Sequence, residues 1–138
     1  MIDPLQSALK IASSGLSAQS TRMRIVAENL ANADSTGSTA GANPYSRKTV
    51  TFENALGRAS IDGQVRVRSI GIDEKPFRQE YRPGHPAADA QGFVKLPNVD
   101  PLIELADMRE ANRAYQANLQ AIRQSRELIT LTLDMLKG

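Results

Sequence analysis

The sequence predicts a mainly α-helical protein with a small β insertion. Two terminal helices are expected to form a coiled-coil domain, joined by a short irregular and β-rich middle segment. Two observations predict this class: mostly apolar side chains recur at intervals of four and three residues at both ends of the 138-residue chain, and the middle alternates with a period of two. The expected boundaries are 1–32, 33–98 and 99–138.

The N-terminal helix carries two apolar stripes. The first has heptad spacing and comprises Leu5, Leu9, Ala12, Leu16, Gln19, Met23, Val26 and Leu30. The second comprises Ile11, Ala18 and Ile25. Asp3 is expected to cap the helix, with Pro4 at the first helical position. Gly15 costs about 1 kcal/mol relative to Ala inside a helix, so it indicates either close approach by a neighbouring helix or a tolerated local bend.

The C-terminal helix is expected to begin after Asp100, and it also carries two stripes. Its heptad seam comprises Leu105, Met108, Asn112, Tyr115, Leu119, Ile122, Arg126, Ile129, Leu133 and Leu136. Its second stripe comprises Ala114, Ala121, Leu128 and Met135. The polar seam residues Asn112 and Arg126 either set register and partner number or mark where the seam turns to solvent. One antiparallel pairing covers one stripe per helix, so the other stripes are expected to pack on other copies or other proteins.

The middle segment predicts four short strands and two irregular stretches. Apolar residues alternate with polar ones near residues 48–52, 65–68, 77–82 and 94–96. Ile70 and Ile72 are out of phase with Val65 and Val67, which predicts a bulge or a bend near Ser69 and Gly71. Turn-forming residues fill 32–43, which is expected to be a linker or a loop that orders on assembly. Two prolines and two glycines make 82–92 an extended, semi-rigid loop.

Composition argues against catalysis. The chain has no Cys and a single His, His85, so it offers no thiolate metal site and no imidazole pair. Asp73 and Glu74 are adjacent, and strand neighbours point to opposite sides, so a solvated turn is favoured over an acid pair. No active site, metal or cofactor is expected. The formal charge of +2 is thinly spread, which disfavours nucleic acid as a partner.

The usual targeting signals are also missing from the sequence. No run approaches the ~20 apolar residues of a membrane span, and the N-terminus does not read as a cleaved secretory signal. By these rules the protein is expected in the cytoplasm. The expectation fails if export uses a route without a cleaved hydrophobic signal.

Several segments together resemble the rod and hook proteins of the bacterial flagellum. They are residues 13–19 with Arg22, 27–32 with Ser35 and Thr36, 44–48, 81–89, 92–99 and 107–118. The segments 44–48, 81–89 and 92–99 are most similar to a proximal-rod member. The short middle segment differs from the distal-rod and hook members, which carry long insertions.

The resemblance implies a structural subunit of the flagellar basal-body rod, required for flagellum assembly and motility. Such subunits polymerise through their terminal helices into a hollow helical drive shaft in the periplasm. The implied partners are other copies, proximal and distal rod proteins, the rod-base adaptor and the flagellar type III export apparatus. Export would leave the N-terminal region uncleaved.

Subunit contacts are expected on both seams and on the proline-rich loop. The expected interface residues are Leu5, Leu9, Leu16, Met23, Val26, Leu30, Asn112, Tyr115, Leu119, Ile122, Ile129, Leu133, Leu136, Pro83 and His85. Two alternatives stay open: another axial rod component, and a soluble helical adaptor or chaperone for partner helices.

Overall fold

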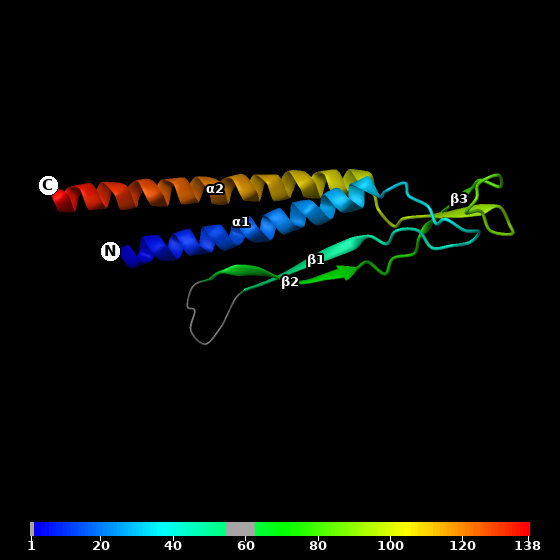
Figure 1. Cartoon of the computed structure of the whole chain (residues 1–138), viewed down its shortest axis with the longest axis horizontal. Helices are drawn as coiled ribbons and strands as arrows, with labels where there is room; N and C mark the ends of the chain where they lie inside the picture. The colour runs from blue at the N-terminus through cyan, green and yellow to red at the C-terminus, as the bar shows by residue number, and fades with distance from the viewer. Residues whose placement is uncertain (1, 55–62) are drawn as a thin grey trace. The chain divides into compact units, whose positions relative to one another are not determined.

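The computed structural model of the protein describes residues 2–54 and 63–138. A long helix comes first in the chain and another comes last, with short strands between them in the sequence (Figure 1). The elements in chain order are α1 (Ile2–Ala31), β1 (Lys48–Asn54), β2 (Val65–Ile72), β3 (Arg78–Tyr81), β4 (Phe93–Leu96) and α2 (Pro101–Lys137). The predicted class, mainly helical with a small β part between terminal helices, is confirmed.

The chain divides into two compact units, and each unit takes residues from both helices and from the middle segment. Unit 1 comprises Met1–Met23, Thr51–Ser69 and Arg109–Gly138; unit 2 comprises Arg24–Val50 and Ile70–Met108. The two helices are antiparallel partners within each unit. Gly15 faces Asn118 in unit 1, and Asn29 is hydrogen-bonded to Glu104 in unit 2.

The two helices begin differently. α2 starts at Pro101 as predicted, and Oδ1 of Asp100 accepts a hydrogen bond from the Leu102 amide at 2.9 Å. α1 already includes Ile2, so the prediction that Asp3 caps it is wrong. Pro4 still falls within the first turn, where a missing N–H leaves no intrahelical bond unmade. From inside that turn, the Asp3 carboxylate interacts favourably with the positive end of the helix dipole.

The four predicted strands form two separate two-stranded sheets. β1 pairs with β2, and β3 pairs antiparallel with β4 in a register that sets Tyr81 opposite Phe93. β2 is continuous, and its half-buried positions are Val65, Val67 and Gly71, whereas Ser69 is exposed. Ile70 and Ile72 are exposed, so they do not share the half-buried face of Val65 and Val67.

Residues 32–43 are packed within unit 2, which differs from the predicted linker. The segment opens with turns in which the Ala33 amide donates to the Leu30 carbonyl and the Ser35 amide to the Asn32 carbonyl. Farther along, the Gly41 amide donates to the Ala87 carbonyl at 3.1 Å. Ala33 is buried, so the chain leaves α1 along a fixed path. A turn-rich composition does not reveal such partners, because they come from the distant 82–92 loop.

Candidate functional site

In unit 1, the inner face of α2 is rotated from the predicted seam. Its buried or half-buried positions include Ala111, Tyr115, Asn118, Ile122, Ser125, Ile129 and Thr132. Asn112, Arg126 and Leu133, which were predicted in the seam, are exposed. At every second position of the predicted seam, the residue that lies on the inner face is therefore the one just before it in the sequence. These residues have small or polar side chains. Small residues let two helices approach closely, and that contact outweighs the larger apolar residues of the predicted stripe.

Gly15 lies where α1 and α2 come together in unit 1. A Cβ at this position would lie 2.6 Å from Nδ2 and 2.9 Å from Cγ of Asn118. These distances are shorter than real Cβ contacts, so the space is filled by the Asn118 amide. Of the two explanations for Gly15, the structure supports close approach by a neighbouring helix. The approaching group is a side chain of α2.

The chain itself covers two of the three residues in the second stripe of α1, whereas Ile11 stays 39% exposed. Ala18 and Ile25 are each 2% exposed, and Ala18 borders a recess that Val65 and Val67 also line in unit 1. The Val65 amide donates to Oγ of Ser14 at 3.1 Å, and that hydroxyl donates to the Ile11 carbonyl at 2.7 Å. The prediction that this stripe packs on other copies or other proteins is therefore wrong for Ala18 and Ile25, and it stays a prediction for Ile11.

Unit 2 contains a buried polar network centred on Asn29. Its Nδ2 donates to the Lys48 carbonyl at 2.9 Å, and its Oδ1 accepts from the Lys48 amide at 2.9 Å. The side-chain amide thus pairs with the first residue of β1 as a neighbouring strand would. Nδ2 also donates to Oε2 of Glu104 at 3.3 Å, and the Tyr45 hydroxyl donates to Oδ1 at 2.7 Å. These four hydrogen bonds connect the end of α1 to Tyr45, to the start of β1 and to the start of α2.

Glu104 carries the charge of this network, and its side chain is fully buried. Arg47 donates from Nε to Oε1 of Glu104 and from Nη1 to Oδ2 of Asp73, the latter at 3.4 Å. Burial alone lowers the pKa of Arg47, but the hydrogen bond and charge of Glu104, together with Asp73, raise it above its usual value. Removing one partner of such a buried pair leaves the other charge uncompensated.

Asn98 completes the network from the other side of residue 47. Its Oδ1 accepts from the Arg47 amide at 2.8 Å, and its Nδ2 donates to the carbonyls of Asp73 and Lys75, each at 3.0 Å. In the described part of the chain, no buried side-chain nitrogen or oxygen lacks a partner. The solvated turn that was favoured for Asp73 and Glu74 describes Glu74, which is exposed, whereas Asp73 is half-buried and accepts from Arg47.

Sequence reasoning did not identify this network. Asn29, Arg47 and Asn98 all lie in segments that carried the family resemblance, which was the only available signal. Glu104 had no such signal, because it lies outside those segments and its neighbours in the sequence do not distinguish it from any other helical Glu. It lies 75 residues from Asn29, and no local pattern joins positions so far apart.

The proline-rich loop is held by its own turns. The His85 ring accepts at Nδ1 from the Ala87 amide at 3.0 Å, which agrees with a hydrogen-bonded loop histidine. Tyr81 and Phe93 pack edge to face at 5.4 Å where the loop meets β3 and β4. Gly92 has φ +88°, and a Cβ there would lie 2.8 Å from Cε2 of Tyr81. These contacts hold the loop in one conformation, in which Pro83 is exposed.

The predicted interface residues fall into three groups. Val26 is buried, and the exposed ones are Asn112, Leu133, Leu136 and Pro83. The half-buried ones are Leu5, Leu9, Leu16, Met23, Leu30, Tyr115, Leu119, Ile122, Ile129 and His85. Most of the predicted set thus already has contacts inside the chain. Leu136 continues the inner spacing of Ile129 and Thr132 but is 75% exposed, so α1 leaves it uncovered.

Large apolar side chains are exposed at both ends of α2. In unit 2 they are Leu102, Ile103 and Leu105; in unit 1 they are Leu128, Leu131, Leu133, Met135 and Leu136. The second predicted stripe of α2 is therefore uncovered at its C-terminal end, at Leu128 and Met135. An exposed apolar cluster of this kind is typical of a protein interaction surface.

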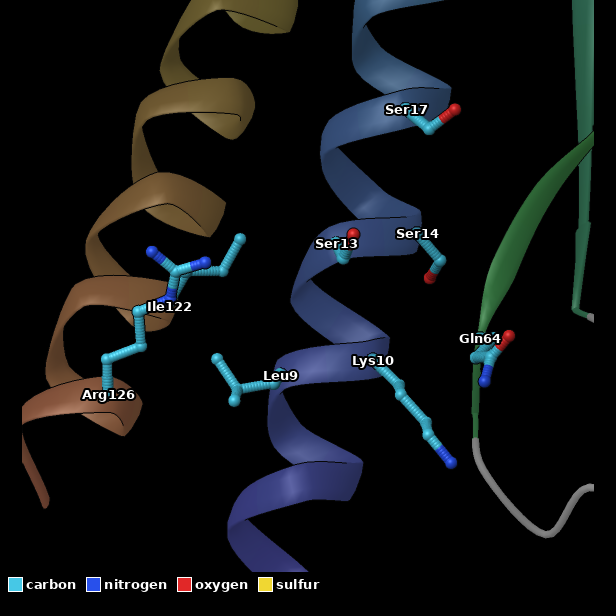
Figure 2. Close-up of a pocket in the computed structure, with 8 residues that line it drawn as sticks. All are labelled: Leu9, Lys10, Ser13, Ser14, Ser17, Gln64, Ile122 and Arg126. Carbon is cyan, nitrogen blue, oxygen red and sulfur yellow. The ribbon is translucent and has the colours of Figure 1, made fainter. Parts of the chain in front are cut away.

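The described residues offer little for small-molecule chemistry. In residues 2–54 and 63–138, no three acidic, His or Cys side chains are grouped as a metal site. An open hollow of about 530 Å³ in unit 1 is lined by side chains of α1, α2 and Gln64 (Figure 2), and none of these is an acid or a histidine. None of the helices over the same residues has the length and hydropathy to cross a membrane.

Comparisons with known proteins agree with an assembly surface. Residues 9–38 match the family model described as flagella basal body rod protein, and residues 90–135 match the flagellar basal body rod FlgEFG protein C-terminal model. The chain is 60% identical to flagellar basal-body rod protein FlgC of Agrobacterium fabrum, over 99% of both chains. It is 42% identical to FlgC of Yersinia enterocolitica over 91% of this chain and 92% of the relative. FlgC of Aquifex aeolicus is 40% identical over 94% and 96%, respectively. The chain therefore belongs to the FlgC family of flagellar basal-body rod proteins, and it is a structural subunit of the rod.

Proposed function

We propose that this rod subunit polymerises with copies of itself and with adjoining rod proteins through the exposed apolar end of α2. The observation that carries this proposal is the cluster of Leu128, Leu131, Leu133, Met135 and Leu136, all more than 40% exposed. Burying such a side chain contributes about 1.5–3 kcal/mol. In an isolated chain these side chains stay largely in water, so most of this free energy is not gained. In a rod, neighbouring subunits bury them.

The remaining expected contacts belong to the same proposal. The half-buried seam residues, among them Leu9 and Ile122, contribute what surface they keep, and Pro83 contributes a rigid loop. A proline-locked loop loses little conformational entropy when it docks. Asn112 is exposed on α2, so it contacts a neighbouring subunit instead of setting register inside the chain. The subunit acts by packing alone and is not an enzyme.

The proposed location is the proximal rod in the periplasm. The family resemblance implies passage through the flagellar type III export apparatus without cleavage of the N-terminal region. The other expected partners are the distal rod and the rod-base adaptor protein. No feature of the structure favours the alternative of a soluble adaptor, which would form a discrete small oligomer instead of a rod.

The test is a chain that ends at Thr130, which removes four of the five exposed apolar residues. This chain should be exported, because the implied export information lies near the N-terminus, and it should fail to join the rod. Secretion is measured in the culture medium and incorporation in isolated basal bodies. A chain ending at Leu136 is the matched control and should build flagella. Motile cells with the Thr130 truncation would contradict the proposal.

A further inference from the structure

The hollow in unit 1 is a groove with a floor of small side chains. Ser13 and Ser17 of α1 lie between Ile122 and Arg126 of α2 on one side and Gln64 on the other (Figure 2). Both serines are exposed, so the groove is open along its length. A floor of serines lets a helix approach α1 closely, because no large side chain stands in its way. This surface is called the serine groove below.

The charge of the serine groove is positive. Lys10 and Arg126 both line it and both are exposed, whereas the lining contains no carboxylate. Leu9 and Ile122 supply half-buried apolar surface between these cations. An occupant that fits this lining is a helix with an apolar face and acidic residues along its edge.

The C-terminal end of α2 has this combination. Leu128, Leu131 and Met135 are spaced three and four residues apart, so they share one face, and they are 51%, 52% and 76% exposed. Glu127 and Asp134 are spaced four and three residues from Leu131, so they line one edge of that face. This surface, called the leucine stripe below, is apolar with an acidic border.

The leucine stripe cannot occupy the serine groove of its own chain. Leu131 follows Arg126 by five residues and therefore lies about 140° away around the same helix. The groove and the stripe are thus two different surfaces of one unit. Contacts between unlike surfaces of identical subunits form a ring where the rotation closes and an open helical array where it does not.

We propose that the serine groove of one copy binds the leucine stripe of a second copy, with Lys10 and Arg126 facing Glu127 and Asp134 across the contact. This inference rests on the proposed function and adds the pair of surfaces by which copies join. Apolar burial supplies the attraction, and the opposite charges set the direction in which the second helix lies.

Disulfide formation between copies tests this pairing directly, because the chain has no cysteine of its own. Cells would produce Ser17→Cys and Leu131→Cys chains together as their only copies of the subunit. Mild oxidation of isolated basal bodies should give a disulfide-linked dimer that needs both variants. Thr130→Cys, an exposed neighbour on another face of α2, replaces Leu131→Cys as the control and should give at least tenfold less dimer.

Motile cells without the dimer, or with equal dimer from Thr130→Cys, would overturn the pairing and leave the proposed rod function standing. If either cysteine stops rod assembly, charge reversal decides instead. Lys10→Glu with Arg126→Glu should reduce rod number about tenfold, as should Glu127→Lys with Asp134→Lys, because each pair creates like-charge contacts. All four changes together should restore rods to within twofold of the natural level, and failure of that rescue would overturn the inference.

Discussion

The two units of the chain bury different kinds of residue. Unit 2 buries branched apolar side chains, including Ile25, Val94 and Val99, and it fully satisfies the polar groups of Asn29 and Glu104. Unit 1 buries mainly small residues, which are Ala12, Ala18, Ala111 and Ser125. Its large side chains at the end of α2 stay in water.

This difference separates a unit that is stabilised from within from one that needs neighbours. Burying a large apolar side chain contributes about 1.5–3 kcal/mol, and an alanine much less. Unit 2 collects that contribution inside one chain. Unit 1 leaves its largest apolar residues exposed, and under the proposed function other subunits cover them. Under the same proposal, unit 2 is stable on its own while unit 1 assembles.

The largest expected effect on stability comes from the charged centre of unit 2. Glu104→Ala leaves the Arg47 guanidinium without its main partner and should lower the free energy of unfolding by about 3 kcal/mol. The lower end of the range for buried pairs applies because the Arg47 side chain keeps 23% exposure. Chemical denaturation followed by circular dichroism measures the loss. Glu110→Ala, on an exposed position of α2, is the control and should change stability by less than about 0.5 kcal/mol.

Removing the Asn29 amide should have the next largest effect. Asn29→Ala leaves the Lys48 amide and carbonyl unpaired and should cost about 2 kcal/mol. Asn32→Ala is a useful comparison, because Asn32 donates only to the Glu28 carbonyl of its own helix. Equal stability losses in the two variants would show that the hydrogen bonds from Asn29 to Lys48 stabilise the fold no more than a hydrogen bond within one turn does.

In unit 1 the expected effects are smaller and depend on one contact. Gly15→Ala gains helix propensity but forces the Asn118 amide to move, so we expect a net loss of about 1 kcal/mol. Asn118→Ala removes the obstruction. When Gly15→Ala is added to Asn118→Ala, it should therefore cause no further loss of stability. Thermal unfolding of the four proteins measures the coupling. Additive losses would mean that Gly15 and Asn118 do not share the space.

The smallest effect concerns the exposed pair of Glu28 and Lys48. The hydrogen bond from Lys48 at 2.9 Å lowers the pKa of Glu28 and raises that of Lys48. A lowered carboxyl pKa gives stability that is present above the unfolded pKa and is lost as pH falls through the folded value. In Lys48→Met the pKa of Glu28 should rise toward its ordinary value of 4.5 in an NMR titration. An unchanged pKa would show that the pair is not formed in solution.

Periodicity predicted the elements better than their packing. Both helices and all four strands follow from spacings of four and three or of two, which are local properties of the sequence. Which face of a helix is buried is not local. The face with Ala111 and Ser125 carries a weak apolar signal, yet it is buried because small residues face Gly15 and its neighbours on α1.

The partners of α1 were also beyond local reasoning. The stripe that includes Ala18 predicted an external partner, but Ala18 itself is buried and lies beside strand residues such as Val65. A two-residue alternation identifies a strand without saying which surface the strand will meet. The network of Asn29 and Glu104 depends in the same way on residues far apart in the sequence.

Amide hydrogen exchange on the purified monomer tests the contrast between the units most directly. Exchange in residues 24–50 and 70–108 should be strongly slowed, because their hydrogen bonds open only with unfolding of unit 2. Exchange in residues 2–23 and 109–138 should be at least tenfold faster, since these helices lack the contacts that a rod supplies. Strong protection throughout residues 5 to 30, equal in the two units, would contradict the claim that unit 1 is stabilised by its neighbours.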